Sequence, residues 1–305
     1  MRGPRRRVLV VLAALLVLGA LVAVGVTVDA VYAPGRVGGS AAEPRTAGTR
    51  PASPHPTTGH PTTPRPAAAT AAALPPLRVV GLGDSVPAAD TCGCNGYLEQ
   101  LAPALRATTG RRVTLANDAT GGWTTQDVLG DLATGTSHRD LVAGADLVVV
   151  EIGANDFDLS KLTDPSCAPA GSSPCFRSTL AHLRSGLTQV VDRVTSLAPS
   201  ARVALLGYWN VGLDGSVGRS QGSTYVTSSD ALTRAVNQVV VGVTRSTGSV
   251  YVDAYTPFKG SNGRRDPTED LLDDGDHPNA SGHSRLADAV LDALQTSGAV
   301  AGWKG

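Results

Sequence analysis

The chain has 305 residues, with 26 basic and 26 acidic side chains and a formal net charge of zero. This balance hides an asymmetry, because residues 1–76 carry eight arginines and only two acidic residues. Residues 77–305 therefore hold 18 basic and 24 acidic groups, a net charge of −6. Because a negative domain lacks the basic surface that nucleic acids bind, we expect no nucleic-acid partner. This part is long enough to bury one hydrophobic core.

The first thirty residues have the pattern of an export segment. Four arginines within residues 2–7 precede an uncharged apolar run over residues 8–28. A run of this length can span a bilayer as a helix, and the arginines would keep the N-terminus in the cytoplasm. A cleaved signal peptide is the alternative, with Val28-Asp29-Ala30 as the cleavage site. The first interpretation predicts a single-pass, membrane-anchored protein outside the cytoplasm, and the second predicts a secreted one.

Residues 31–76 are rich in Pro, Thr, Ala and Gly, with almost no large apolar side chain. Such a composition cannot bury a core, so it predicts an extended, disordered linker. We therefore expect three parts: a signal anchor or signal peptide over residues 1–30, this linker, and one folded domain over residues 77–305.

Within residues 77–305, short apolar segments alternate with amphipathic ones. The expected strands cover residues 77–82, 112–116, 146–152, 202–208 and 249–254. The expected helices cover residues 97–108, 125–133, 176–197, 229–245 and 281–295. Such alternation favours right-handed crossovers and a parallel sheet covered on both faces. The sequence predicts an α/β fold: a three-layer α/β/α sandwich with a five-stranded parallel sheet of the flavodoxin-like type.

Residues able to do chemistry follow four of these strands. Ser85 follows the first strand, Gly122 lies in the loop after the second, and Asn155 follows the third. The loop after the fifth strand leads to Asp274 and His277. In parallel sheets, ligands bind beyond the carboxyl ends of the strands. We therefore expect these five residues to meet on one rim, although each motif is short and carries little weight alone.

The residue types fit acyl chemistry. A serine hydroxyl becomes a nucleophile when a base takes its proton, and an imidazole held by a carboxylate is the usual base. His277 can supply the imidazole, with Asp274 or Asp276 as its carboxylate. Attack on an ester carbonyl places negative charge on oxygen, and each donor aimed at it contributes about 3 kcal/mol. The backbone N–H groups of Ser85 and Gly122, together with the Asn155 carboxamide, would provide three donors.

The motifs, in this order, resemble those of the SGNH, or GDSL-type, hydrolases, and the resemblance covers essentially all of residues 77–305. Val86 stands where the family name has Leu. The matching blocks are residues 83–85, 117–122, 153–156 and 274–278. The stretches 92–94 and 207–215 resemble secreted actinobacterial members.

The resemblance implies a role for each residue. Ser85 is the expected nucleophile, Gly122 and Asn155 are oxyanion donors alongside the Ser85 N–H, His277 is the base, and Asp274 orients it. It also implies a monomeric esterase that works through an acyl-enzyme, without metal or organic cofactor. The substrate stays open between polysaccharide or peptidoglycan O-acetyl esters, short-chain carboxylic esters, and lysophospholipids or other lipids. An acyltransferase and a non-catalytic glycan-binding module are further alternatives.

Three further residues are candidates for the site, one as a rival nucleophile and two as pocket-lining residues. Ser220 lies in Gly218-Arg219-Ser220-Gln221-Gly222, which matches the G-x-S-x-G pattern but lacks the strand that this pattern needs before it. We expect a flexible loop there. Trp123 and Trp209 are candidates to line the substrate pocket, and aromatic packing on loops is the alternative.

The four cysteines form an even set that an exported protein can use for disulfides. Closeness in sequence suggests the pairs Cys92–Cys94 and Cys167–Cys175, although three connectivities are possible. Zinc is the alternative. We expect none, because no histidine has ligand spacing to these cysteines.

Overall fold

The computed structural model describes residues 74–304. The expected anchor or signal peptide, and the linker up to residue 73, lie outside the described residues. Among the residues that are described, no helix combines the length and the apolar character needed to cross a membrane.

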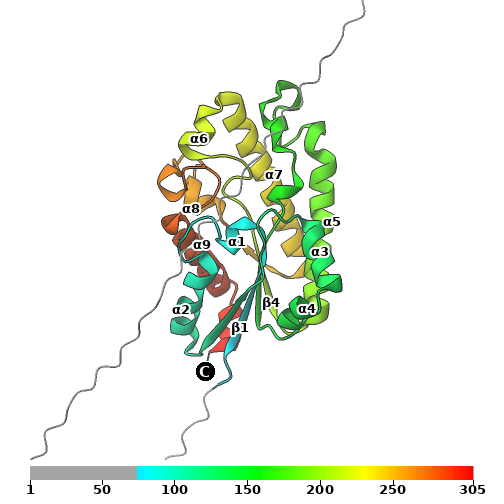
Figure 1. Cartoon of the computed structure of the whole chain (residues 1–305), viewed down its shortest axis with the longest axis vertical. Coiled ribbons are helices and arrows are strands. Elements are labelled where there is room, and N and C mark those ends of the chain that lie inside the picture. The colour runs from blue at the N-terminus through cyan, green and yellow to red at the C-terminus, as the bar shows by residue number, and fades with distance from the viewer. Residues whose placement is uncertain (1–73, 305) are drawn as a thin grey trace, which may run out of the picture. The chain divides into compact units, whose positions relative to one another are not determined.

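The centre of the fold is a parallel sheet of five strands in the order β2-β1-β3-β4-β5 (Figure 1). Their bounds are β1 Leu77–Gly83, β2 Val113–Asn117, β3 Leu147–Glu151, β4 Arg202–Leu206 and β5 Val250–Val252. All five residues of β3 are buried, as expected for a strand covered on both faces. The order is that of flavodoxin-like sheets, with the chain reversing its direction of winding between β1 and β3. The predicted fold class is confirmed.

Helices cover both faces of this sheet (Figure 1). One face carries α2 (Tyr97–Thr109) and α9 (Ala280–Thr296). The other carries α3 (Thr125–Thr134), α4 (Thr136–Ala143), α5 (Pro174–Leu197) and α7 (Ser223–Thr247). Shorter helices are α1 (Ser85–Ala88), α6 (Gly215–Ser220) and α8 (Tyr255–Lys259). Single 3₁₀ turns cover Ala154–Asp156, Leu159–Thr163, Pro165–Cys167, Thr268–Asp270 and Ala299–Trp303.

Four short helices are not among the elements expected from the sequence: α1, α4, α6 and α8. Residues 136–143 form α4, which the prediction left without structure. The expected loop around Ser220 is the end of α6. This short helix begins where the Asp214 carboxylate accepts a hydrogen bond from the Gly215 N–H (2.8 Å). A capping carboxylate satisfies backbone donors that Gly and Ser residues alone would leave open.

The close approach of β1 to β3 requires glycine at position 83. Gly83 pairs with Glu151 and has φ +152°, a conformation that L side chains rarely adopt. A Cβ placed there would lie 2.0 Å from the carbonyl oxygen of Glu151. Ser85 follows two residues later, so this contact positions the start of α1 against β3.

We expect Gly83→Ala to lower the free energy of unfolding by more than about 3 kcal/mol, because it adds backbone strain and a clash with a main-chain oxygen. Gly130→Ala is the matched control. Gly130 is exposed within α3, and a Cβ there has open space around it. This change should stabilise the protein by about 0.5–1 kcal/mol through helix propensity. Urea denaturation measures both, and a Gly83→Ala variant as stable as wild type would contradict the packing described.

Candidate active site

Ser85 is the first residue of α1, directly after β1. The preceding residue, Asp84, caps this helix, because its side chain accepts a hydrogen bond from the Val86 N–H (3.2 Å). The Asp84 N–H in turn donates to the Glu151 carbonyl (3.3 Å). Ser85 therefore sits at a turn whose backbone is tied to the end of β3, with its side chain at the carboxyl edge of the sheet.

His277 faces Ser85 across 192 residues of sequence. Its Nε2 lies 2.9 Å from the Ser85 Oγ, and its Nδ1 lies 2.7 Å from Asp274 Oδ2. The imidazole side chain is 18% exposed. In this arrangement a neutral imidazole donates Nδ1–H to the carboxylate and leaves Nε2 free to accept the serine proton.

Asp274, rather than Asp276, contacts the imidazole. Its other oxygen, Oδ1, accepts hydrogen bonds from the N–H groups of Asp276 (2.9 Å) and His277 (3.0 Å). Partial burial acts to raise the pKa of Asp274, but these two bonds and the His277 ring hold it below its usual value. The group is therefore a carboxylate at neutral pH, suited to orient an imidazole.

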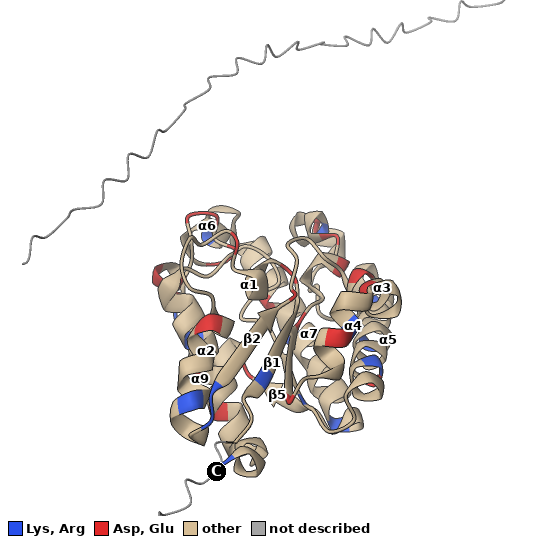
Figure 2. Cartoon of the chain, turned by 60° about the horizontal axis from the view of Figure 1, so that its bottom comes forward, with Lys and Arg blue, Asp and Glu red and all other residues tan. Residues whose placement is uncertain are grey.

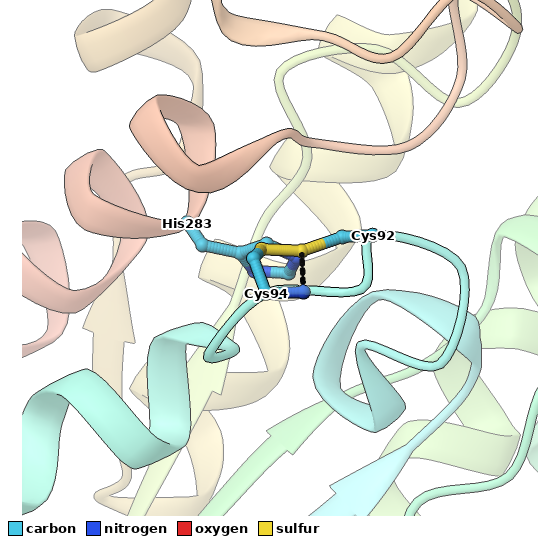
Figure 3. Close-up of side chains that lie close together, drawn as sticks. All are labelled: Cys92, Cys94 and His283. Atoms are coloured by element: carbon cyan, nitrogen blue, oxygen red, sulfur yellow. Dashed lines mark hydrogen bonds between the residues drawn. A yellow bond between two sulfur atoms is a disulfide. The ribbon is translucent and has the colours of Figure 1, made fainter.

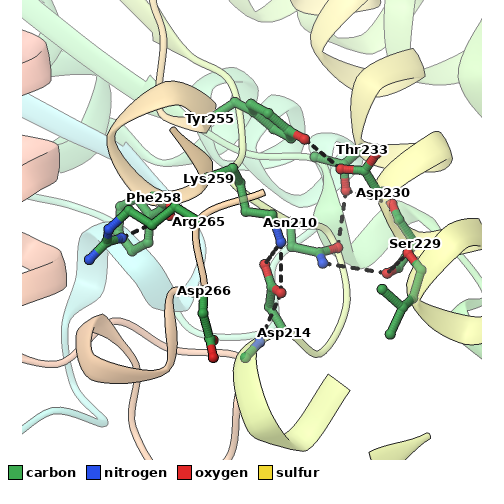
Figure 4. Close-up of polar contacts among 12 residues, drawn as sticks. Asn210, Asp214, Ser229, Asp230, Thr233, Tyr255, Phe258, Lys259, Arg265 and Asp266 are labelled. Carbon is green, nitrogen blue, oxygen red and sulfur yellow. Dashed lines mark hydrogen bonds and ion pairs between the residues drawn. The ribbon is translucent and has the colours of Figure 1, made fainter. Parts of the chain in front are cut away.

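Contacts from α6 and α8 hold the loop that carries Asp274 and His277. The Asp214 N–H donates to the Gly275 carbonyl (2.7 Å), and a Cβ at Gly275 would lie 2.5 Å from Val217 Cβ. Figure 4 shows how Asp214 is fixed in turn: Lys259 Nζ reaches both of its carboxylate oxygens, each at 2.8 Å. Both side chains of this ion pair are nearly buried, so its loss would leave an uncompensated charge beside the loop.

The expected oxyanion donors lie on neighbouring loops. Asn155 Nδ2 donates to the Trp123 carbonyl (2.9 Å), which uses one of its two N–H bonds and leaves the other for a substrate. Gly122 is exposed, has φ +81°, and has open space around the position of a Cβ. A Cβ on the adjacent Gly121 would lie 3.7 Å from Ser85 Cβ. The loop after β2 therefore passes directly beside the serine.

Tyr208 joins two of these loops, and sequence reasoning missed it. Its hydroxyl donates to Asp84 Oδ2 (3.2 Å) and accepts a hydrogen bond from the Ala154 N–H (3.2 Å). Its own backbone N–H and C=O bond to the carboxamide of Asn237, each at 2.8 Å. The phenol thus links the turn before Ser85 to the turn that carries Asn155. No local signal marks it, because its partners lie 54 and 124 residues away.

The carboxyl groups of Asp84 and Glu151 are buried near the turn that carries Ser85. Glu151 is fully buried, and neither of its carboxyl oxygens has a hydrogen-bond partner among the described residues. Burial, reinforced by the nearby Asp84, raises the pKa of Glu151 well above its usual value. Burial also raises the pKa of Asp84, to about 7, against the bonds from Val86 and Tyr208 that favour its charged form. Burial therefore favours the neutral form of Glu151, and Asp84 titrates near pH 7.

A small cavity of about 50 Å³ lies against Ser85, Asn155 and His277. Leu159 and residues 208–211 also line it. Trp209 is therefore at the cavity, as expected of a residue near substrate, but it is also 2% exposed and stacked on Phe258 (4.6 Å between ring centroids, 18° between planes). Trp123 is half-buried and does not line this cavity.

The remaining candidates lie as follows. Ser220 ends α6 and donates its hydroxyl to the Val217 carbonyl (2.7 Å), and β4 has ended at residue 206, so the strand-to-helix elbow is absent from this segment. The four cysteines are joined in the pairs that closeness in sequence suggests.

Acidic residues are frequent around the site (Figure 2). Those in its loops include Asp84, Asp90, Asp118, Asp156, Asp273, Asp274 and Asp276.

Comparisons with known proteins bear on the family and the fold of the chain. The model of the GDSL-like Lipase/Acylhydrolase family matches residues 82–285, about two thirds of the chain. No curated protein matches the chain significantly.

Among solved structures, the lipase Lip_vut3 from a goat rumen metagenome is similar, with 18% identity, a TM-score of 0.56, and coverage of 71% of this chain and 97% of that one. A catalytic mutant of Axe2, an acetylxylan esterase from Geobacillus stearothermophilus, has 20% identity, a TM-score of 0.50, and coverage of 71% and 93%. LAE5, an alpha/beta hydrolase from the metagenome of Lake Arreo in Spain, has 21% identity, a TM-score of 0.50, and coverage of 71% and 94%. At these identities the likeness shows a shared fold.

The raised pKa of Asp84 predicts a pH-dependent stability that Asp84→Asn removes. Between its usual value of 3.8 and about 7, the folded protein keeps a proton on Asp84 that the unfolded chain releases. Wild-type stability therefore falls as pH rises through this window, by at most about 4 kcal/mol at 1.36 kcal/mol per pH unit. Asparagine keeps the capping oxygen but does not titrate.

The free energy of unfolding of Asp84→Asn should therefore rise relative to wild type from about pH 4 to pH 7 and level off above. Urea denaturation across this range measures the difference. A difference that does not change with pH would mean that Asp84 is ionised throughout.

Proposed function

The chain belongs to the GDSL-like lipase/acylhydrolase family, and on that premise we propose that it is a serine esterase that hydrolyses carboxylic esters through an acyl-enzyme on Ser85. The observation that carries the proposal is the continuous contact from Ser85 Oγ to His277 Nε2 and from His277 Nδ1 to Asp274. Such a chain activates a hydroxyl that would otherwise be a weak nucleophile.

The reaction proceeds in two halves. His277 Nε2 takes the proton of Ser85 as Oγ bonds to the ester carbonyl carbon, and it then gives that proton to the departing alkoxide, so that the alcohol leaves. Water attacks the resulting acyl-serine, with its proton again taken by His277, and the acid is released as the serine regains a proton. Asp274 stabilises the imidazolium that forms in each half.

Three donors would stabilise the oxyanion. The backbone N–H of Ser85 begins α1, and the loop of Gly122 passes beside the serine. One N–H of the Asn155 carboxamide is bonded to the Trp123 carbonyl, and its second N–H has no hydrogen-bond partner among residues 74–304. Donors held in place before the reaction cost no reorganisation in the transition state, which is why this effect is large.

The cavity at Ser85 supports a short acyl group. Its volume of about 50 Å³ is far below the roughly 300–1,000 Å³ of pockets that enclose drug-sized ligands, so it suits a small acyl group. The buried side chains Tyr208, Trp209 and Val211 close it on one side. The acidic residues around the site would repel anionic substrates. Together these features favour neutral esters of small acids, such as O-acetylated sugars, over lipid esters.

Replacing the nucleophile tests the proposal. Ser85→Ala should lower kcat for p-nitrophenyl acetate by at least about 10⁴-fold and abolish labelling by a fluorophosphonate, because the acyl-enzyme forms on the Ser85 hydroxyl. Ser220→Ala is the control and should keep both the turnover and the labelling.

Asp274→Asn should cost more activity than Asp276→Asn, since only Asp274 contacts the imidazole. Wild-type turnover by folded Ser85→Ala would exclude the proposal.

Acyl selectivity tests the cavity separately. We expect kcat/KM for p-nitrophenyl acetate to exceed that for the palmitate ester by at least tenfold, because a long chain finds no space beside Ser85. Leu159→Ala, at the cavity wall, should improve activity on p-nitrophenyl butyrate relative to acetate. Equal activity on acetate and palmitate would show that the acyl chain does not enter this cavity.

A further inference from the structure

A second group of reactive side chains lies apart from Ser85, between the loop that follows α1 and the start of α9. Cys92 and Cys94 are in that loop, and His283 is the fourth residue of α9. The fold brings their sulfur atoms and one imidazole nitrogen within 4.8 Å of one another (Figure 3). No sequence motif marks this histidine as a partner, because about 190 residues separate it from the cysteines.

His283 differs from a histidine that merely fills a core. It is 1% exposed, and its Nδ1 is buried without a hydrogen-bond partner among residues 74–304. Its ring lies against that of Tyr97, with the centroids 6.3 Å apart and the planes at 21°. Burying a polar nitrogen without a partner costs free energy, so an unpaired ring nitrogen calls for a ligand.

The two cysteines offer matching donors. Their Cα atoms are 5.2 Å apart, and the Cys92 sulfur accepts a hydrogen bond from the Cys94 N–H (3.1 Å). A hydrogen bond to sulfur favours the thiolate, which is the form that binds metals. Two thiolates and one imidazole are a ligand set that zinc prefers over hard cations such as Mg²⁺.

We propose that Cys92, Cys94 and His283 form a zinc site when the two cysteines are reduced. Three protein ligands leave the fourth tetrahedral position to water. The expectation that these cysteines bind no zinc rested on spacing along the chain, and the tertiary structure supplies the histidine that spacing could not reveal.

Oxidation and zinc compete for the same two sulfur atoms. In the structure these atoms are bonded to each other, and a disulfide has no thiolate to offer. A thiol or phosphine reductant supplies two electrons, two protons complete the two thiols, and the reductant is itself oxidised. Zinc then displaces both thiol protons to solvent and bonds to the two thiolates and the imidazole. The site therefore loads with metal only in its dithiol form.

Loading would tie together two segments that flank the active site. The cysteine loop begins at Ala89, directly after α1. Helix α9 is capped by Asn279, two residues after His277. Zinc would therefore cross-link the segment that follows Ser85 to the helix that follows His277. A ligand that binds only the folded state stabilises it.

The test uses the full-length protein, reduced with a phosphine that is then removed under argon. Cobalt is the spectroscopic probe, because Co²⁺ bound to thiolates gives a sulfur-to-metal charge-transfer band in the near ultraviolet. We expect one equivalent of Co²⁺ to produce this band and Zn²⁺ to abolish it by displacement. Zn²⁺ should also raise the Tm of the reduced protein by about 5 °C. Absence of the band in reduced wild type would overturn the proposal.

Variants separate this site from others in the protein. Cys94→Ser and His283→Gln should each weaken Co²⁺ binding by at least tenfold, with circular dichroism as the check on folding. The double variant Cys167→Ser/Cys175→Ser should keep the band. Among residues 74–304, this pair belongs to no cluster of side chains close enough to bind one metal ion. His138→Gln should also keep it, which controls for the group Asp118, Asp131 and His138.

If His283→Gln does not fold, Cys94→Ser decides the question, because Cys94 lies in a half-buried loop rather than in the core. Full cobalt affinity in Cys94→Ser, or loss of the band in His138→Gln, would assign the metal to another site and overturn the proposal. Esterase activity is not needed as a readout, so failure of the zinc site leaves the role of Ser85 untouched.

Discussion

The geometry of the site depends on how closely β1 approaches β3 at the last residue of β1. Gly83 faces the Glu151 carbonyl at a distance that admits no side chain. This contact brings the loops that follow the two strands side by side, one with Ser85 and the other with Asn155. A nucleophile and an oxyanion donor must lie within a few ångströms of one carbonyl group, and two adjacent parallel strands provide that spacing.

The same packing carries an electrostatic cost. Asp84 and Glu151 are both nearly inaccessible to water, and the burial that raises their pKa values disfavours two charges close together. Hydrogen bonds from Val86 and Tyr208 offset part of this cost for Asp84. Buried titratable groups of this kind are frequent at functional sites, where local stability is lower than elsewhere in a domain.

The loop with Asp274 and His277 is braced from two directions. On one side the Asp214–Lys259 ion pair holds α6 against Gly275. On the other side α9 begins immediately after the loop, and its first turn contains the buried His283. The imidazole that faces Ser85 is therefore positioned by packed elements, although the loop itself is partly exposed. The general base His277 can therefore lie on a loop, because the elements packed on both sides of that loop fix its position.

The sequence by itself determined the sheet, its five longest helices and the order of the polar loops, because apolar strands followed by Gly, Asn or Asp are encoded locally and parallel strands end on one side. It also identified Ser85, Asn155, Asp274 and His277 as residues of that edge. It misjudged residues 215–220 as a loop, because the carboxylate that caps α6 is held by a lysine 45 residues away. Tyr208, Glu151 and His283 could be recognised only in the folded protein. Periodicity reports which face of an element is buried, whereas the distance between side chains on remote segments is decided by how the helices pack on the sheet.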